Sequence, residues 1–557
     1  MFRLRDILVF LVLIFLENVI KADQNHSQTI LIELPDKLSL NEITYFQIFE
    51  LESSTEHKII LKNLQNTKDV FGLLQIHSFL YPIAVEDLQG TIIDGTNIGF
   101  TVQKDGEFTL KNNNNYVNVE AAITFIAMNK STAPIPGGCN KVVSEFSVPI
   151  IKISGINDEN SDIIKVSTPL ASSARSQNCT GSDVTYEHRY KYLRIGDMSS
   201  STYFDGIKDM ITAEQARQNG RKTHLSYNTE NETISLFAKI KGTGIVFQTI
   251  ALDYGGRSVY IPGVTYSCNV SAWKSNCTRR DLLSVGFYVV ILIISILLMT
   301  RMFLPRTVNH LAVGMGTGLV LGTYITTFIS MDIDWKAFIA IFTSLSCTGI
   351  NYVICQRYSK ISHYITSFWL CYFSSLSLFF VTSASFNLVD YQYIFLVSFI
   401  ILGTIFLGIL ETVEIKTSIL AGGFIFLFSI SFMINGHLKN IIEQPFYLVK
   451  DFKYFYATKD LLIAPQDMIS LLIAIACVVF LFISYNRYGN VWEKLLERER
   501  LMRARRVALG GGTLEERLQV ASEQTPLITR YTETEEDEVF ESPNTNKEFY
   551  KRIKRNH

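Results

Sequence analysis

The sequence predicts a membrane protein in two parts: an N-terminal all-β ectodomain of two β-sandwich modules, followed by an α-helical seven-transmembrane bundle. Three observations lead to this prediction. The chain begins like a secretory signal, strand-like runs dominate residues 23–280, and long apolar runs follow one another from Leu282 onward. Composition agrees, because 48% of the 557 residues are hydrophobic and only 18% are charged, against about 25% charged in an ordinary soluble domain.

Residues 1–22 are predicted to be a signal peptide. Arg3 and Arg5 give a basic start, and residues 7–16 form an unbroken apolar run. That run is too short to cross a bilayer, which needs about 20 residues. Ala22 offers a small residue for cleavage, which would leave the new N-terminus outside. The alternative is an uncleaved anchor.

Residues 23–155 and 156–280 are predicted to form two β-rich lumenal or extracellular modules, joined near residues 155–165. The expected strands are rich in Ile, Leu, Phe, Tyr and Thr and are bounded by polar breaks. They comprise residues 43–51, 58–61, 73–81, 121–127, 236–240 and 244–251. One helical candidate lies within residues 198–220, where a polar helix-forming run ends at Asn219 and Gly220.

Six N-x-S/T sequons agree with export, because all of them precede residue 280. Each is an acceptor pattern for N-linked glycans, and six behind a signal peptide are more informative than one. The predicted glycosylation sites are Asn25, Asn129, Asn178, Asn231, Asn269 and Asn276. We therefore expect a membrane glycoprotein.

The eight cysteines divide evenly between the two parts of the chain. The exported four, Cys139, Cys179, Cys268 and Cys277, allow three pairings. We favour a disulfide bond between Cys268 and Cys277, which would close a short loop, and another between Cys139 and Cys179. The other four lie in apolar runs and are expected to be free packing residues.

Residues 281–484 are predicted to hold the seven spans, and residues 485–557 to form a cytosolic tail. The spans are expected at residues 282–300, 308–331, 335–355, 361–382, 391–411, 415–434 and 467–484. Seven spans after an outside N-terminus place the C-terminus in the cytosol. The charge rule agrees, because residues 485–506 carry seven Lys or Arg against three Glu, a net charge of +4.

Gly314, Gly318 and Gly322 recur every four residues, which puts them on one face of the second span. Without side chains there, another helix can approach closely. We predict that these three residues form a glycine seam for helix packing, either inside the bundle or between the protomers of a homo-oligomer. No ionisable residue is expected at the middle of a span, where such groups mark ion and proton pathways.

Catalytic and metal-binding patterns are missing from the sequence. No G-x-S-x-G elbow precedes a helix, no H-E-x-x-H occurs, and the cysteine spacing matches no C-x-x-C site. We therefore expect no enzyme activity and no cofactor. The net charge of −1 provides no basic field for nucleic acid, so the expected partners are membrane lipid and an unidentified extracellular or lumenal ligand.

The tail carries a predicted sorting motif. Glu523, Leu527 and Ile528 fit the acidic dileucine pattern E-x-x-x-L-[LI] that clathrin adaptors read. Residues 550–553 fit the commoner pattern Y-x-x-Φ. We expect the protein to move between the plasma membrane and endolysosomal compartments through an adaptor.

Several short runs resemble one known family. They are residues 75–78, 136–140, 260–262, 265–268 and 523–528. With the signal peptide and seven spans, the chain resembles the transmembrane 7 superfamily member 3 family, and its seven-span domain is similar to that of transmembrane protein 198. The resemblance implies a pro-survival membrane protein that attenuates endoplasmic reticulum stress and the unfolded protein response. It implies no catalytic residues, and this tail extends beyond the family pattern.

Two other functions are considered. A heptahelical signalling receptor is suggested by Gln356-Arg357-Tyr358 at the end of the third span, although the usual acidic residue is replaced by Gln and the last span lacks N-P-x-x-Y. A transporter or channel is disfavoured by the missing charges within the spans.

Overall fold

The computed structural model describes most of the chain from residue 29 to residue 508. The described residues are 29–35, 38–64, 69–87, 90–139, 149–155, 162–173, 184–195, 197–223, 226–240, 242–268, 282–328, 333–358, 360–383, 389–410, 414–434, 436–438, 440–441, 447, 452–459, 463 and 465–508. Two compact units, residues 1–475 and 476–557, make up the chain. The predicted signal peptide and the sorting motif lie outside the described residues.

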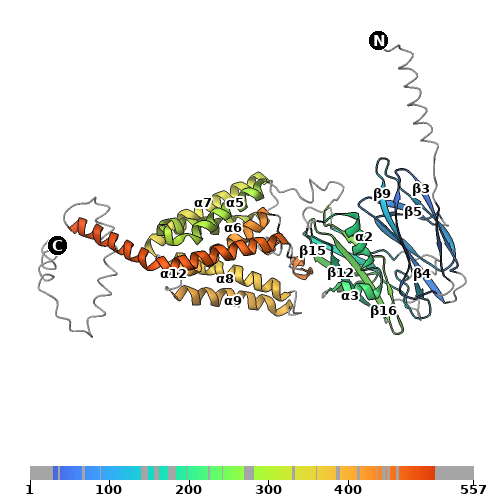
Figure 1. Cartoon of the computed structure of the whole chain (residues 1–557). Helices are drawn as coiled ribbons and strands as arrows, with labels where there is room; N and C mark the ends of the chain where they lie inside the picture. Colours follow the sequence, from blue (N-terminus) through green and yellow to red (C-terminus); the bar gives the residue numbers. More distant parts are fainter. Residues whose placement is uncertain are drawn as a thin grey trace, which may run out of the picture. The chain divides into compact units, whose positions relative to one another are not determined.

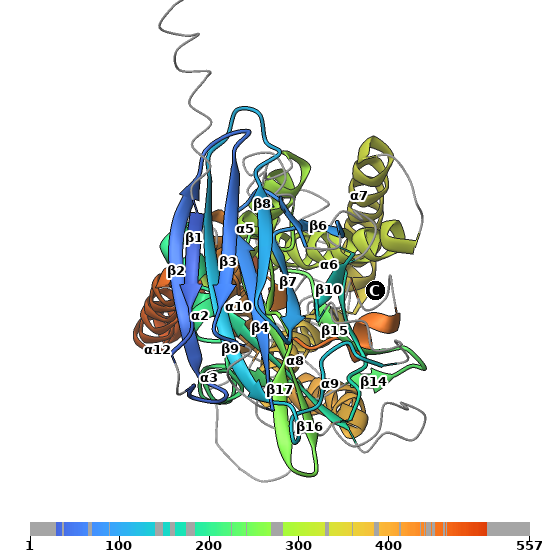
Figure 2. The ribbon, with the colours of Figure 1, turned by 90° about the vertical axis from the view of Figure 1, so that its right-hand side faces the viewer.

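The first module is a β-sandwich, as predicted (Figure 1). In the described residues one sheet has the order β1 (Thr29–Glu33), β3 (Glu56–Lys62), β8 (Gly106–Lys111), β5 (Ile83–Glu86) and β6 (Ile92–Gly95), and Figure 2 shows β1, β3 and β8 side by side. The other sheet has the order β2 (Ile43–Leu51), β9 (Val119–Asn129), β4 (Val70–Ser78) and β7 (Asn97–Val102). Side chains such as Ile59, Phe108, Leu74 and Phe125 fill the core between the sheets.

The second module repeats this two-sheet arrangement. In the described residues one sheet has the order β10 (Lys152–Ser154), β11 (Ile163–Pro169), β15 (Glu232–Ala238) and β14 (Ser226–Asn228). The other has the order β13 (Arg221–Lys222), β12 (Thr185–Tyr192), β16 (Ile245–Asp253) and β17 (Gly256–Val259), with β18 (Gly263–Thr265) also pairing with β16. Val166 and Phe237 from the first sheet pack with Tyr190 and Phe247 from the second.

The boundary between the modules differs from the sequence prediction. Residues 155–165 were expected to join the modules. However, β10, which comes before this stretch, pairs antiparallel with β11, which begins near its end. Both strands belong to one sheet of the second module, so this module begins before β10. Gly155, which follows β10, has a φ of +88°, and a Cβ there would lie 2.5 Å from the Ile163 carbonyl oxygen, so glycine is required at this position.

The helical candidate within residues 198–220 is two helices in the structure. Helix α3 (Ala213–Asn219) matches the prediction and begins with a capping box between Thr212 and Gln215. Helix α2 (Ser200–Lys208) was not predicted, because Ser, Thr, Tyr and Gly are weak helix formers. Its Ser199 cap and the burial of its apolar face stabilise it instead.

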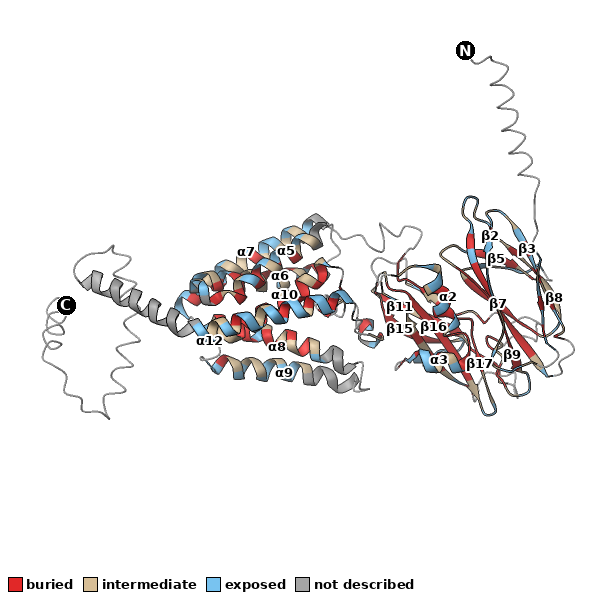
Figure 3. Ribbon diagram, in the orientation of Figure 1, coloured by how far each residue is buried: buried red, intermediate tan, exposed pale blue. Residues whose placement is uncertain are grey.

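The two modules share one continuous apolar layer. The face of β4 and β9 that points away from the first core packs on α2, α3, β16 and β17, through residues such as Phe71 and Ile126 against Phe204 and Val246. Strands β4 and β9 are therefore buried on both faces (Figure 3). This explains why the polar residues Gln75, His77 and Ser78 of β4 are buried together with its apolar residues.

Seven long helices in the described chain coincide with the seven expected spans. They are α5 (Leu282–Met299), α6 (Arg306–Phe328), α7 (Ile333–Arg357), α8 (Lys360–Ser383), α9 (Val389–Ile409), α10 (Glu414–Met433) and α12 (Pro465–Ala508). Among the described residues, the segments Trp335–Arg357, Glu414–Met433 and Pro465–Arg487 are long and apolar enough to cross a membrane. The full count of seven spans stays a prediction.

Helix α12 is longer than its predicted span, which was expected to end at residue 484. It continues to Ala508, so the basic start of the predicted tail is helical. The run from Glu493 to Arg506 is made mostly of Glu, Lys, Leu, Met, Ala and Arg, which are strong helix formers. In the second unit the described residues, 476–508, are helical throughout.

Candidate functional site

A buried hydrogen-bond network crosses the junction between the modules. His77 of β4 lies with its Nδ1 2.8 Å from the Asn97 side-chain oxygen. The Tyr203 hydroxyl of α2 lies 3.2 Å from the same oxygen and 3.0 Å from the Ser78 carbonyl oxygen. Burial lowers the pKa of His77 to about 4, so the ring is neutral at neutral pH. The network fixes α2 of the second module on β4 of the first.

A second buried histidine lies inside the second module. His188 of β12 has its Nδ1 3.0 Å from the Thr249 hydroxyl and its Nε2 2.8 Å from the Thr233 hydroxyl. Burial lowers its pKa to about 4 as well. Both ring nitrogens are used within the core, so the histidine acts as a structural bridge between the two sheets.

A short segment between α10 and α12 docks on the second module. We call residues 452–459, which include the 3-10 helix η4 (Phe452–Tyr456), the docking segment. The Thr458 N–H donates to the Leu236 carbonyl at 2.7 Å, and the Ala238 N–H donates to the Thr458 carbonyl at 3.0 Å. Within the described residues β14 pairs with residues 233–235 of β15 and no further. Thr458 therefore supplies hydrogen-bond partners to the backbone of the next part of that strand edge, residues 236–238.

Side chains reinforce the docking segment. Tyr454 is only 2% exposed and packs with Ile163 and Ala238 at the end of the sheet. The Lys459 ammonium lies 5.0 Å from the centre of the Tyr454 ring, within range of a cation–π contact. Burial lowers the pKa of Lys459 to about 8. No local sequence pattern predicts this contact, because it joins residues more than 200 positions apart.

Asp467, in the first turn of α12, holds the chain that leads to the docking segment. Its carboxylate accepts from the Ser431 hydroxyl at 2.8 Å and from the His437 and Leu438 N–H groups at 2.9 and 3.1 Å. The residue is fully buried. A Cβ at Gly436 would lie 2.2 Å from this carboxylate, so only glycine fits there. The end of α10 and the start of α12 are thus tied by one acidic side chain.

An ion pair connects the end of α5 to the start of α10. Arg301 pairs with the Glu414 carboxylate and donates to the Ser418 hydroxyl at 2.8 Å. The Arg301 side chain is 6% exposed and that of Glu414 is 30% exposed. Arg301 follows the expected span at residues 282–300 and Glu414 precedes the one at residues 415–434, so both are expected at the cytosolic face. Their opposite signs at the same expected membrane face are the signal that points to the pair.

The three seam glycines of α6 face α7 of the same chain. A Cβ at Gly318 would lie 2.5 Å from the Thr343 carbonyl oxygen, and one at Gly314 or Gly322 would lie 2.8 Å from a backbone Cα of α7. The close approach lets α7 donate to α6, since the Thr343 hydroxyl bonds the Gly318 carbonyl at 3.0 Å. Ser344 and Asn351 make similar bonds to the Met315 and His310 carbonyls at 3.1 and 2.6 Å. The seam therefore lies inside the bundle rather than between protomers.

Other polar contacts lie between helices in the bundle. The hydroxyls of Tyr324 and Tyr372 are 2.9 Å apart, and the Trp369 indole donates to the Thr317 hydroxyl at 3.1 Å. These join α6 to α8. Within the described residues no group of three His, Cys, Asp or Glu side chains is placed to hold a metal ion.

Two of the six predicted glycan acceptors lie in the described chain. Asn129 ends β9 and is partly buried, whereas Asn231 is exposed just before β15. Cys139 and Cys268 are disulfide-bonded, but Cys179 and Cys277 lie outside the described residues, so the pairing stays a prediction. Asn25, Asn178, Asn269, Asn276 and the motif residues Glu523, Leu527 and Ile528 also lie outside them. Cys347, Cys355, Cys371 and Cys477 are free, as expected.

The fold is that of a membrane protein with an N-terminal double β-sandwich and a C-terminal helical region that contains three candidate membrane spans. Residues 134–271, which span the second module, match the family described as TM7SF3-like, second immunoglobulin-like domain. The match is confined to residues 134–271 and gives the second module the character of that immunoglobulin-like domain. Curated proteins contain no match to the chain.

Proposed function

We propose that this chain is a non-enzymatic multi-pass membrane glycoprotein whose ectodomain senses or binds a ligand and communicates with the helical domain. The docking segment carries this proposal. Backbone hydrogen bonds and the buried Tyr454 hold it on β15, and α12 begins at Pro465, six residues after Lys459 ends the segment. A change at the ectodomain that altered this edge would therefore be passed along the chain towards α12.

The non-enzymatic part of the proposal is supported by the use of the buried histidines. His77 and His188 are held by Asn97, Thr233 and Thr249 within packed cores. Burial keeps the pKa of each well below the range of an effective acid or base near neutral pH. Both histidines therefore serve to hold neighbouring strands and helices in place within the packed cores.

By family resemblance, the finer role proposed is pro-survival attenuation of endoplasmic reticulum stress and the unfolded protein response. We further propose seven spans, an outside N-terminus, a cytosolic C-terminus and residence at the plasma membrane or in endolysosomal compartments. A ligand on the ectodomain and a clathrin adaptor on the tail are the proposed partners. Glycosidase should reduce the protein's mass, and protease added outside intact cells should spare a C-terminal tag.

The test uses cells that lack the protein, treated with an inhibitor of the reticular calcium pump. Re-expressed wild-type protein should lower a transcriptional reporter of the unfolded protein response and raise survival. Tyr454→Ala, which removes the buried ring, should lose this rescue. Tyr456→Ala is the matched control, because that tyrosine lies in the same 3-10 helix and is 48% exposed.

The outcomes separate the two parts of the proposal. Failure of the wild-type protein to change the reporter would refute the stress role. Full rescue by Tyr454→Ala, at equal surface and total amounts of protein, would show that the docking segment does not transmit the effect.

A further inference from the structure

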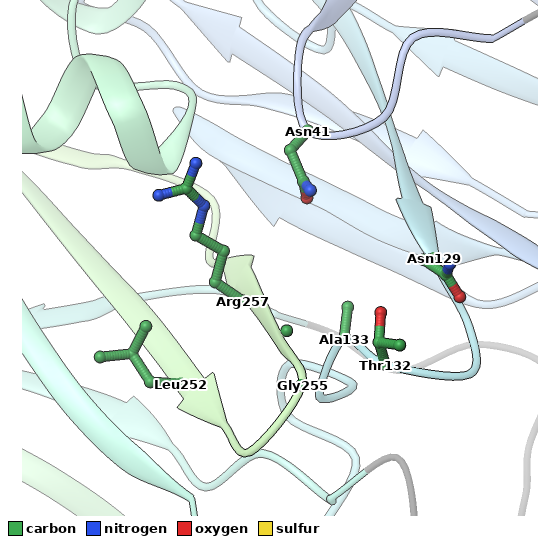
Figure 4. A pocket seen from close by; sticks show the side chains of 8 residues that line it. Asn41, Asn129, Thr132, Ala133, Leu252, Gly255 and Arg257 are labelled. Atoms are coloured by element: carbon green, nitrogen blue, oxygen red, sulfur yellow. The ribbon is translucent and has the colours of Figure 1, made fainter.

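A hollow opens between the two modules beside one predicted glycan acceptor. This junction hollow holds about 350 Å³. Its lining comes from Asn41, Asn129, Thr132 and Ala133 on one side and from Leu252, Gly255, Gly256 and Arg257 of the β16–β17 hairpin on the other (Figure 4). The volume is at the lower end of the range of about 300–1,000 Å³ for small-molecule sites, which suits one or two sugar rings.

The Asn129 side chain is held with its oxygen turned into a local loop. The Ser131 N–H and the Ser131 hydroxyl both bond the Asn129 side-chain oxygen, at 2.9 and 2.6 Å. These are the two residues that define the sequon. Because both bonds use the oxygen, the amide nitrogen is the atom left for attachment of an oligosaccharide.

The lining offers groups that recognise a sugar. Asn41 and Thr132 supply an amide and a hydroxyl, each of which both donates and accepts. Arg257 supplies guanidinium donors and is oriented by Glu214, whose carboxylate lies 3.4 Å away. Leu252 and Ala133 add an apolar wall. The hollow therefore offers both polar and apolar contacts, and a pyranose ring can use both.

Two glycines keep the hollow open. A Cβ at Gly256 would lie 2.5 Å from the Thr132 carbonyl oxygen, so any side chain there would push the hairpin off the first module. A Cβ at Gly255 would meet only Thr132, at an ordinary 3.8 Å. A larger residue at position 255 would therefore fill the hollow without strain on the backbone.

We propose that Asn129 carries an N-linked oligosaccharide whose innermost sugars lie in the junction hollow, contacting both modules. The donor is a lipid-pyrophosphate-linked oligosaccharide. The bond between the Asn129 nitrogen and sugar C1 forms, the bond from C1 to the pyrophosphate oxygen breaks, and one amide proton is released to a base. The lipid pyrophosphate leaves with its electron pair.

The experiment follows enzymatic release of glycans from the full-length protein, site by site, by mass spectrometry. Peptide N-glycosidase is added to native and to denatured protein in water labelled with heavy oxygen, which marks each released site. The Asn129 glycan should be released at least 10-fold more slowly from native than from denatured protein. Asn231, which is exposed, should show a much smaller difference.

Gly255→Leu tests the location itself, because it leaves the sequon intact and fills the hollow. In that variant the Asn129 glycan should become as accessible as the one at Asn231. Three results would each overturn the proposal: no glycan on Asn129, equal release from native and denatured wild-type protein, or slow release that Gly255→Leu leaves unchanged.

Discussion

Replacement of Gly318 by Leu tests the packing of α6 against α7 most directly. The new Cβ would lie 2.5 Å from the Thr343 carbonyl oxygen and 2.6 Å from the Ser344 Cα. Both are backbone atoms of α7, so no rotation of a side chain can relieve the contact. The two helices must move apart, and the rest of the leucine side chain increases the separation.

The magnitude follows from two effects. Overpacking of a tight interface costs about 1–3 kcal/mol. Separation of the helices also weakens the bonds from Thr343 and Ser344 to the α6 carbonyls, each worth on average about 0.6 kcal/mol between membrane helices. Together they predict a loss of about 2–4 kcal/mol in the free energy of unfolding, which is roughly a 30- to 700-fold change in the folded-to-unfolded ratio.

The assay is the thermal midpoint of the full chain in detergent, read as the fraction that stays monodisperse on size-exclusion chromatography after heating. Gly349→Leu is the matched control, since position 349 of α7 is exposed and a Cβ there would meet no atom within 4 Å. We expect a lower midpoint for Gly318→Leu only. Equal midpoints for the two variants would refute the assignment of the seam to the α6–α7 contact.

Three further predictions concern other parts of the chain. The pKa of His77 is about 4 in the folded state and about 6.5 when unfolded; the unfolded state therefore binds more protons below pH 6.5, and stability should fall by about 2 kcal/mol at pH 5. His188 has the same lowered pKa and adds a similar loss, so His77→Gln should remove about half of the combined slope in melting curves recorded from pH 7 to pH 5, and an unchanged slope would exclude His77 as a cause. Arg301→Met leaves Glu414 without its counter-charge and should lower the thermal midpoint, with partial recovery when Glu414→Gln is added; additive losses would argue against the ion pair. Leu527→Ala with Ile528→Ala should raise the fraction of the protein at the cell surface, measured by biotinylation. An unchanged fraction would show that the predicted sorting motif does not act in internalisation.

The sequence predicts local elements well here and long-range contacts poorly. The expected strand at residues 43–51 is β2, because its apolar pattern and polar boundaries are local properties. Helix α2 escaped prediction, since it depends on burial against β4 rather than on its own residues. The polar stretch after Gly155 reads as a linker between modules in composition, although β10 before it and β11 after it pair in one sheet of the second module.

In the candidate site, too, local features could be predicted from the sequence and long-range contacts could not. The glycine seam follows from a spacing of four residues, so the sequence reveals that face of the helix but not its neighbour. The docking of Thr458 on β15 depends on where β14 ends and on a fold that brings distant segments together. No local pattern of residues carries that information.

The double burial of β4 and β9 has a consequence for the order of events during synthesis. Once Asn129 has been synthesised, every described strand of the first module is present, yet Phe71 and Ile126 still lack their partners. The covering layer ends with Ile261 and Tyr266, more than 130 residues later in the chain. At about 5–20 residues per second, an apolar sheet face stays uncovered for roughly 7–26 s. During that interval the half-made protein exposes apolar surface of the kind that chaperones bind.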